Sequence, residues 1–453
     1  MLHKRTLTLF SYDWDRPAFD ALAAEWPQVR AGFDLFSFPS NARLVWFDMD
    51  RFVALLAWRA RVQQLSAVVS NHEQFGALVA AMLAERMGWP GTPVRAVLAC
   101  QHKLYAREVL QRVCPEANLA FSRLQAAYGG PVPDDLTYPQ FVKPVKAAFS
   151  VLARCVHSTE DLHAHTRFGG WELWVIRHLV EPFERVIQAR LPEAGTAHSL
   201  MLEEPVDAPQ YCLDGYVFNG EVVVVGVVGV RTYPGTQSFM GFDYPCHVAQ
   251  ALRQQATAVA QAFLTEIGFS HGGFNMEFFV VPGSQQVKVI EFNPRMASQF
   301  SDLYRRVDGV DLHAIALALA HGQDPASLPR LAPTAAVATS FVYRLFDAGR
   351  RPHRPSAEQK ASFHQAYPDA VLLEFPMSAR EIQRDFKWLG SHRYGIVHLG
   401  GQSPADLRRR CELASALLGW AAPLTATCLF PPGQPAGTVR ATTHDVFEME
   451  TTL

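Results

Sequence analysis

The spacing of apolar and polar residues divides the N-terminal part of the chain into alternating strands and helices. The pattern predicts strands at residues 6–12, 33–38 and 67–70, an amphipathic helix at 17–26 and a helix at 73–87. The last helix should end at Gly88, because a glycine followed closely by Pro90 is typical of a helix C-terminus. Such alternation builds a parallel sheet with helices on both faces, so we expect a first α/β domain at residues 1–98.

The remaining chain carries helices and strands in a less regular order. We expect helices at 99–113, 246–267, 311–321 and 405–418, two strands within 199–219, and further strands at 140–145, 222–230, 272–281, 287–293, 337–342, 370–375 and 396–399. A linker at 325–333 divides a second domain, at 99–330, from a small α+β unit at 331–453. Residues 431–453 are predicted to form a loosely held tail.

The strands at 272–281 and 287–293 predict a hairpin that brings two acids together. If residues 282–286 form a five-residue loop, or 283–285 a three-residue loop, Val281 pairs with Val287 and Glu277 lies directly opposite Glu291. Side chains alternate along a strand, so Asn293 points to the same side as Glu291. Directly opposed carboxylates have Cβ atoms about 5 Å apart and repel each other. One of them must therefore be protonated, or a cation must lie between them.

Magnesium is the cation that best suits this pair of acids. It takes one or two carboxylates together with phosphates and water, and Asn293 adds a neutral carbonyl oxygen. Arg295 follows with a fixed positive charge suited to anionic oxygens around a reacting centre. The alternative is a buried hairpin whose acids are solvated at one edge, since a single Glu in a strand is usually a solvated side chain.

Two lysines earlier in the chain are candidates for binding an anion. Lys143 lies between apolar residues on a predicted strand, directly before Pro144, and a buried ammonium group needs an anionic partner. Lys103 lies in the predicted helix 99–113, with Arg107 one turn further along the same face. A solvated helical lysine explains Lys103 nearly as well.

The phrase Glu-Phe-Asn-Pro-Arg at 291–295, after an apolar strand and with Glu277 on the preceding strand, resembles the magnesium-binding strand pair of the ATP-grasp superfamily. Biotin carboxylase, carbamoyl phosphate synthetase and amino acid ligases are members. The resemblance implies a multidomain α/β and α+β fold: an N-terminal parallel α/β domain, an ATP-grasp core with a lid at about 135–200, and a C-terminal α+β cap like that of biotin carboxylase. It also implies ATP and Mg²⁺ or Mn²⁺ as cofactors.

The same resemblance implies which residues hold the nucleotide. The implied phosphate ligands are Lys103, Lys143 and Ser150, and the implied nucleoside ligands are Glu203 at the adenine amine, the backbone of Glu204 and Val206 at the adenine edge, and Gln210 at the ribose. This chain departs from the family pattern at three places. His102 stands where an acid is usual, residues 146–150 contain no glycine, and Gln210 replaces a glutamate whose hydrogen bonds it can still make.

Composition narrows the class of protein further. The chain has 453 residues, 49% hydrophobic and 19% charged, with a formal net charge of −2, which gives no sign of a nucleic-acid partner. The longest apolar run, 222–230, is too short to cross a bilayer, and residues 1–10 are too short and too polar for a secretory signal. We therefore expect a cytoplasmic protein without a membrane partner. Seven cysteines without Cys-x-x-Cys spacing favour free thiols.

The substrate side of the site is less well marked. Arg231 begins an aromatic, glycine-rich and proline-rich loop at 231–245 and is a candidate for contacting the acceptor substrate. Such a loop can also pack over the core without a functional role. Ser298, together with the small Ala297, leaves room for a carboxylate beside Arg295. His271 is expected to be structural.

The resemblance implies a ligase that phosphorylates a carboxylate to an acyl phosphate and joins it to a nucleophile, most readily an amine. The expected partners are small-molecule carboxylates and amines, with a homodimer possible. Two alternatives stay open: an ATP-binding protein without turnover, and a carboxylase that uses bicarbonate. In biotin carboxylase, Gln-Val-Glu-His follows the arginine that corresponds to Arg295. Here residues 296–300 contain no acid or histidine, which argues against bicarbonate.

Overall fold

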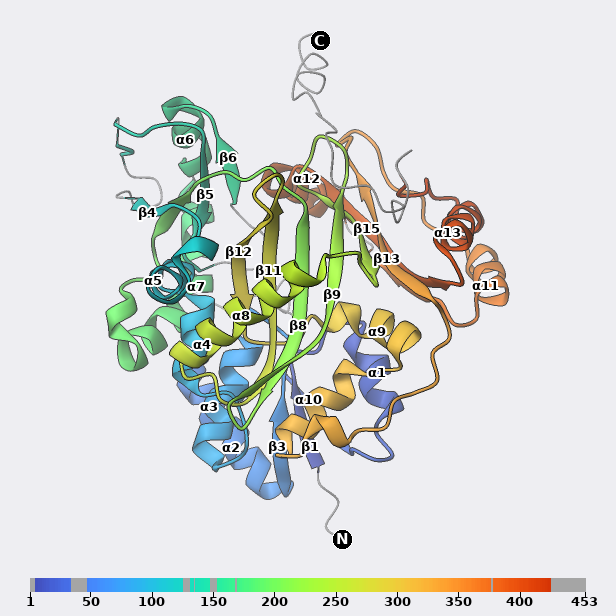
Figure 1. Ribbon diagram of the computed structural model, residues 1–453, viewed down its shortest axis with the longest axis horizontal. Helices are drawn as coiled ribbons and strands as arrows, with labels where there is room; N and C mark the ends of the chain where they lie inside the picture. The colour runs from blue at the N-terminus through green and yellow to red at the C-terminus, as the bar shows by residue number, and fades with distance from the viewer. Residues whose placement is uncertain are drawn as a thin grey trace.

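A computed structural model describes residues 5–33, 47–124, 131–133, 135–146, 153–167, 169–375 and 378–424 of the chain (Figure 1). The described strands form three sheets, of three, eight and four strands. The chain is a mixed α/β structure, as the pattern predicts. No helix within these residues combines the length and the apolar character needed to span a bilayer.

The first sheet is parallel, with the order β2-β1-β3. Its strands and the helices that accompany and follow them are β1 (Arg5–Leu9), α1 (Asp15–Ala21), β2 (Gln28–Ala31), α2 (Met49–Val62), β3 (Leu65–Val69), α3 (Gly76–Met87), α4 (Val94–Gln101) and α5 (Lys103–Val113). Helix α3 ends at Gly88 as predicted, and this glycine has the left-handed φ of 67° that favours it at a helix end.

Three local expectations for this part of the chain need correction. The second strand is β2, which lies before the predicted 33–38, and residues 34–46 of that region lie outside the described residues. Helix α2 was not predicted. The predicted helix at 99–113 is broken at His102, whose backbone is extended. The His102 side chain caps α5, because its Nδ1 accepts a hydrogen bond from the Tyr105 N–H at 3.1 Å.

The central sheet is antiparallel, with the order β12-β11-β8-β9-β10-β13-β15-β14. Its strands are β8 (Gln210–Phe218), β9 (Glu221–Thr232), β10 (Phe239–Tyr244), β11 (Gly272–Val281), β12 (Gln286–Asn293), β13 (Val337–Leu345), β14 (Val371–Glu374) and β15 (His392–Gly401). The last three strands thus extend the central sheet and do not form a sheet of their own. The domain boundaries near residues 98 and 330 stay predictions.

Helices cover both faces of the central sheet (Figure 1). They are α8 (Gln250–Glu266), α9 (Ser301–Asp308), α10 (Leu312–Ala320), α11 (Ala357–Ala366), α12 (Ala379–Leu389) and α13 (Pro404–Leu418). Strand β8 shows how the two faces divide, because alternate side chains pack on opposite sides. Leu213 shares a buried cluster with Phe263 of α8, whereas Cys212 shares one with Leu303 of α9.

The third sheet is small and antiparallel, with the order β4-β7-β5-β6. It comprises β4 (Phe121–Leu124), β5 (Gln140–Pro144), β6 (Arg154–Val156) and β7 (Leu200–Glu203), with α6 (Thr159–Thr166) and α7 (Gly170–Arg190) between β6 and β7. Strands β4 to β6 and helix α6 stand above α5 in Figure 1. The predicted lid at about 135–200 overlaps this unit in the sequence and stays a prediction.

The hairpin of β11 and β12 pairs its two acids as predicted, but its loop and its register differ from the prediction. Val281 pairs with Gln286 and not with Val287, so the connecting loop is one residue shorter than expected. A β-bulge that adds Ile290 to β12 then restores the register, and Glu277 lies opposite Glu291.

A buried ion pair joins the N-terminal unit to helix α10. His313 Nε2 lies 2.9 Å from Asp15 Oδ1, and both side chains are almost completely buried. Asp15 also accepts a hydrogen bond from the Tyr12 N–H at 3.1 Å, so the pair fixes the loop after β1. Burial alone would lower the pKa of His313, but its bonds to Asp15 and Asp311 outweigh burial and raise the pKa to about 9.

We expect His313→Gln to destabilise the protein in a pH-dependent way. Because the folded pKa of His313 exceeds its unfolded value of about 6.5, the contribution is complete below that pH and disappears as pH rises through about 9. Urea unfolding should give a deficit on the order of 3 kcal/mol at pH 6 and a much smaller one at pH 9.5. His364→Gln, on the exposed side of α11, is the control. A deficit that does not change with pH would contradict a charged His313.

Candidate active site

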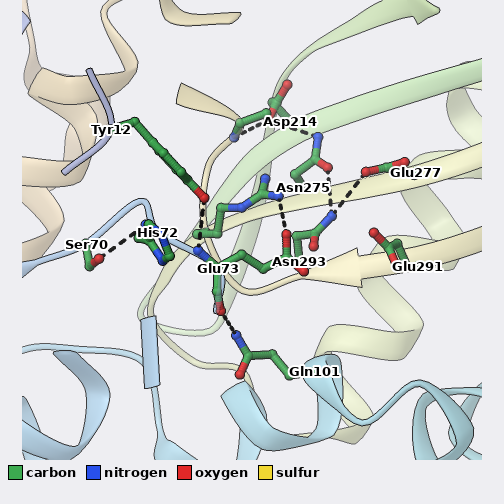
Figure 2. A network of polar contacts seen from close by, with 12 residues as sticks. Tyr12, Ser70, His72, Glu73, Gln101, Asp214, Asn275, Glu277, Glu291 and Asn293 are labelled. Carbon is green, nitrogen blue, oxygen red and sulfur yellow. Dashed lines mark hydrogen bonds and ion pairs between the residues drawn. The ribbon is translucent and has the colours of Figure 1, made fainter. Parts of the chain in front are cut away.

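Two carboxylates and an amide face one another at the edge of the central sheet. Glu277 on β11 lies directly opposite Glu291 on β12, and Asn275 lies opposite Asn293 (Figure 2). The Asn293 amide nitrogen donates to Asn275 Oδ1 at 3.2 Å and to Glu277 Oε1 at 3.4 Å. With its nitrogen used in this way, Asn293 keeps its carbonyl oxygen for another partner.

The two acids differ in charge at neutral pH: Glu277 is neutral and Glu291 is negative. Burial and then the charge of Glu291 raise the pKa of Glu277 to about 8. Burial acts in the same direction on Glu291, but the positive charges of Lys103 and Lys143 outweigh it and lower its pKa to about 2. At neutral pH the pair therefore holds one proton and one negative charge.

The two acids and the amide suit a magnesium ion. Magnesium uses one or two carboxylates and completes its shell with substrate phosphates and water, which matches this small donor set. No group of three or more His, Cys, Asp or Glu side chains within the described residues is arranged to hold a metal. A site with two protein carboxylates therefore needs oxygens from a substrate, as a nucleotide-dependent site does.

Lys103 is placed at the centre of this group by the break between α4 and α5. It is the first residue of α5, and its backbone N–H donates to the carbonyl of Val145, directly after β5, at 3.1 Å. Its ammonium group lies 2.5 Å from Glu291 Oε2. His102 stands where the ATP-grasp resemblance implies an acid. Burial lowers the pKa of His102 to about 4, so the side chain is neutral and its Nδ1 can accept the hydrogen bond that caps α5.

Arg107, one turn further along α5, holds the bulge of β12 in place. Its guanidinium donates to the carbonyls of Val289 at 2.6 Å and Ile290 at 2.9 Å. Its Nε lies 2.6 Å from Glu203 Oε1, and both side chains are almost fully buried. A bulge leaves strand carbonyls without their ladder partners, so Arg107 supplies the donors that this irregularity needs.

The residues implied for the nucleotide are gathered near this point, though not all are free for a ligand. Glu203 Oε2 lies 2.8 Å from the Lys143 ammonium, so Arg107 and Lys143 use both oxygens of the carboxylate. Glu204 bonds to Ala120 through its backbone N–H and its side chain. Gln210 donates to Glu277 Oε2 at 2.9 Å. The Val206 N–H has no hydrogen-bond partner within the described part of the chain.

Arg295 faces the N-terminal unit. Its Nη2 lies 3.0 Å from Glu73 Oε2, and this partner outweighs burial and raises the pKa of Arg295 above its ordinary value. Glu73 lies between β3 and α3, and its backbone N–H donates to the Tyr12 hydroxyl at 3.4 Å (Figure 2). The Glu73 carbonyl accepts from Gln101 at 2.5 Å. The loop before α3 thus completes the charge shell around Arg295.

Several of these residues were not identified from the sequence. Glu73 was assigned only to a helix, and no sequence pattern pairs it with Arg295, which is 222 positions away. Lys146 is a buried ammonium whose pKa is lowered to about 8, chiefly by burial, and it lies 4.8 Å from the centre of the Phe183 ring. The buried Asp214 accepts from Asn275, from the Ala297 N–H and from Tyr304, and so positions the segment after Arg295.

The structure does not bring every predicted site residue to this group. Arg231 forms a two-point ion pair with Asp243, at 2.5 and 3.0 Å, and lies over the Phe341 ring on the sheet face that α13 covers. Ser298 accepts a hydrogen bond from Trp14 at 3.0 Å and so lies beside the N-terminal unit. Ser150 lies outside the described residues.

Comparison with known proteins agrees with this geometry. The model of a family described as "Carbamoyl-phosphate synthase L chain, ATP binding domain" matches residues 245–328, which include the hairpin and Arg295. Carnosine synthase 1 of Gallus gallus is 27% identical over 276 residues, which are 56% of this chain and 27% of that protein. The chain thus spans about a quarter of that relative's length.

Solved structures share the fold across most of the chain. An L-amino acid ligase from Bacillus licheniformis has a TM-score of 0.67 at 14% identity, covering 92% of this chain and 98% of that one. A biotin carboxylase from Campylobacter jejuni has a TM-score of 0.55 at 13% identity, covering 92% and 91%. The fold is the ATP-grasp fold. The family model at residues 245–328 and these likenesses agree with the ATP-grasp resemblance of the hairpin motif.

We expect Arg107→Gln to unfold at markedly lower urea concentration than the parent protein. The change leaves Glu203 with one cation and removes the donors to Val289 and Ile290, and breaking a buried ion pair costs about 3–5 kcal/mol. Arg112→Gln, on the same helix but with half of the side chain exposed, should change stability by less than about 0.5 kcal/mol. Equal effects of the two substitutions would show that Arg107 does not stabilise the bulge.

A second prediction concerns protons released on metal binding. Because Glu277 is protonated at pH 7, binding of magnesium and ATP should displace about one proton, and Glu277→Gln should release none from this site. Titration calorimetry in two buffers with different ionisation enthalpies measures the difference. The same proton release by both proteins would contradict the assigned charge states.

Proposed function

We propose that this chain is an ATP-dependent ligase that activates a carboxylate as an acyl phosphate and joins it to an amine, releasing ADP and phosphate. The observation that carries the proposal is the opposed pair Glu277–Glu291, surrounded by the cations of Lys103, Lys143 and Arg295. Two acids that share one proton next to several cations suit a site where phosphate and metal charges must balance.

In this proposal, Glu277, Glu291 and the Asn293 carbonyl hold Mg²⁺ or Mn²⁺, which supplies charge neutralisation at the nucleotide phosphates. Lys103 and Lys143 face the phosphates. Each has a carboxylate partner in the structure, so each is already oriented before a nucleotide binds.

The adenosine part of ATP is proposed to lie beside β7 and β8. The backbone of Glu204 and Val206 would meet the adenine edge, and Gln210 the ribose. Glu203, tied to Arg107 and Lys143, would orient Lys143 as well as meet the adenine amine. Ser150 stays a proposed phosphate ligand.

Arg295 is proposed to steady the oxygens of the acyl phosphate. Its planar guanidinium is always charged and matches carboxylate and phosphate geometry. Glu73 and the Asp214-bound segment that follows fix its position, so little reorganisation is needed during the reaction.

The substrate class follows from the relatives and from the residues beside Arg295. The likeness to carnosine synthase 1 and to the fold of an L-amino acid ligase supports an amine acceptor and a small-molecule carboxylate. Met296 and Ala297 pack into an apolar cluster, and Ser298 bonds to Trp14. Residues 296–300 contain no acid or histidine to handle bicarbonate, so we favour amide formation over carboxylation. Arg231, tied to Asp243, is a weaker candidate for the acceptor contact than Ser298.

The test is ADP release with ATP, magnesium and pooled carboxylic and amino acids, followed by mass analysis of products. Glu291→Gln should lower ADP release about 100- to 1,000-fold while the protein stays folded, because it removes charge from the metal pair and nothing from the apolar core. Glu221→Gln, at the exposed start of β9, is the matched control.

Three outcomes would count against the proposal. Normal ADP release by folded Glu291→Gln would end the metal assignment. Release that requires bicarbonate and biotin would favour a carboxylase. ATP binding without release for any substrate pair would favour a binding protein without turnover.

A further inference from the structure

Two arginines face each other on the central sheet away from the metal pair. Arg344 on β13 and Arg393 on β15 are direct partners in the antiparallel register. Side chains of directly opposed residues lie on one face about 5 Å apart at Cβ, and like charges in this arrangement are destabilising. The pair is the cationic counterpart of Glu277 and Glu291, and by the same argument it needs an ion of opposite charge.

The hydrogen-bond and ring partners that the described residues offer the two guanidinium groups are neutral. Arg344 donates to the Phe239 carbonyl at 3.2 Å and to the Ser391 hydroxyl at 3.0 Å, and both are neutral. Arg393 lies 4.3 Å from the centre of the Phe375 ring and has no hydrogen bond or ion pair with any described side chain.

One described acid acts on both arginines and also bonds to a histidine. Asp385 of α12 influences both groups, and its Oδ2 lies 3.0 Å from His392 Nδ1. Burial and then the charge of Arg344 lower the pKa of Arg393 to about 10. Both groups therefore stay protonated at neutral pH, and two positive charges remain beside each other.

This arginine pair adjoins the candidate active site. Arg393 lies over the Phe375 ring, and Phe375 packs against the apolar cluster that contains Met296 and Ala297, the residues directly after Arg295. Tyr12 stacks on Trp14 with ring centres 4.7 Å apart, and its hydroxyl accepts from the N–H of Glu73, the partner of Arg295. Tyr12 and Trp14 thus lie beside the Glu73–Arg295 pair and Ser298, to which Trp14 donates.

We propose that Arg344 and Arg393 bind a substrate carboxylate other than the one that is phosphorylated. This inference rests on the proposed function and narrows its substrate class: one substrate carries a second carboxylate. Either the amine is an amino acid, or the activated acid is a dicarboxylate. Two guanidinium forks on one face can take one carboxylate through several charge-assisted hydrogen bonds. The carboxylate also relieves the repulsion between the arginines.

The first experiment does not depend on turnover. Thermal unfolding is followed with glutarate as the anionic probe and glutaramide as its neutral analogue. We expect glutarate to stabilise the parent protein and Arg350→Gln, an exposed arginine just beyond β13, but not Arg393→Gln. Without probe, Arg393→Gln should be at least as stable as the parent protein, because it removes a like charge.

Three results of that experiment would overturn the inference. They are equal stabilisation of the parent protein by glutaramide, unchanged stabilisation of Arg393→Gln by glutarate, and a large loss of stability in Arg393→Gln without probe. The last result would mean that an acid of the chain already neutralises Arg393. Arg393→Lys, which keeps the charge but loses the fork, should respond to glutarate more weakly than the parent protein.

The second experiment identifies the source of the carboxylate. For each substrate pair that releases ADP, KM is measured for both substrates and for their carboxamide analogues. Arg393→Gln should raise KM about tenfold or more for the substrate that bears the second carboxylate and leave kcat within a few fold. A rise for the amine identifies an amino acid, and a rise for the activated acid identifies a dicarboxylate. If both KM values are unchanged, the inference is wrong. If no pair releases ADP, the proposed function fails and the glutarate experiment still decides the inference.

Discussion

The geometry of the site depends on one buried cation, the guanidinium of Arg107. Its donors satisfy the carbonyls of Val289 and Ile290, where β12 carries an extra residue, and that residue brings Glu291 opposite Glu277. Side chains alternate along a strand, so without the extra residue Glu291 would face the other side of the sheet. The same guanidinium binds Glu203, which holds Lys143. One side chain therefore links the acid pair, the sheet of β4 to β7 and Lys143.

Repulsion between like charges is the second constraint on this protein. At β11 and β12 a proton on Glu277 and the ammonium group of Lys103 limit the repulsion, and a metal ion would remove it. At β13 and β15 the two positive charges of Arg344 and Arg393 share the influence of one described acid, Asp385. A folded protein keeps such pairs only where something offsets their cost, so they indicate where ions bind. These are the reasons for proposing a cation at the first pair and an anion at the second.

The N-terminal unit contributes directly to the site. Its three-stranded sheet presents Tyr12 and Glu73 from the ends of β1 and β3, and Glu73 holds Arg295. The buried pair of Asp15 and His313 fixes this unit against α10. The carboxyl ends of parallel strands meet at one edge, so residues about sixty positions apart act together there.

The sequence alone determined the elements with clear periodicity, such as the helix that ends at Gly88. It also determined the acid pair, because a hairpin is local and its alternation places Glu277, Glu291 and Asn293 on one side. The resemblance of this hairpin to the ATP-grasp motif led to the fold that the structure shows. The sequence did not determine the break at His102, the bulge at Ile290 or the partners of Arg107, Arg295 and Arg231. Each of these depends on contacts between residues far apart in the chain. Capping by a histidine and pairing of charges across domains leave no repeating pattern, so only the tertiary structure decides which acid meets which cation.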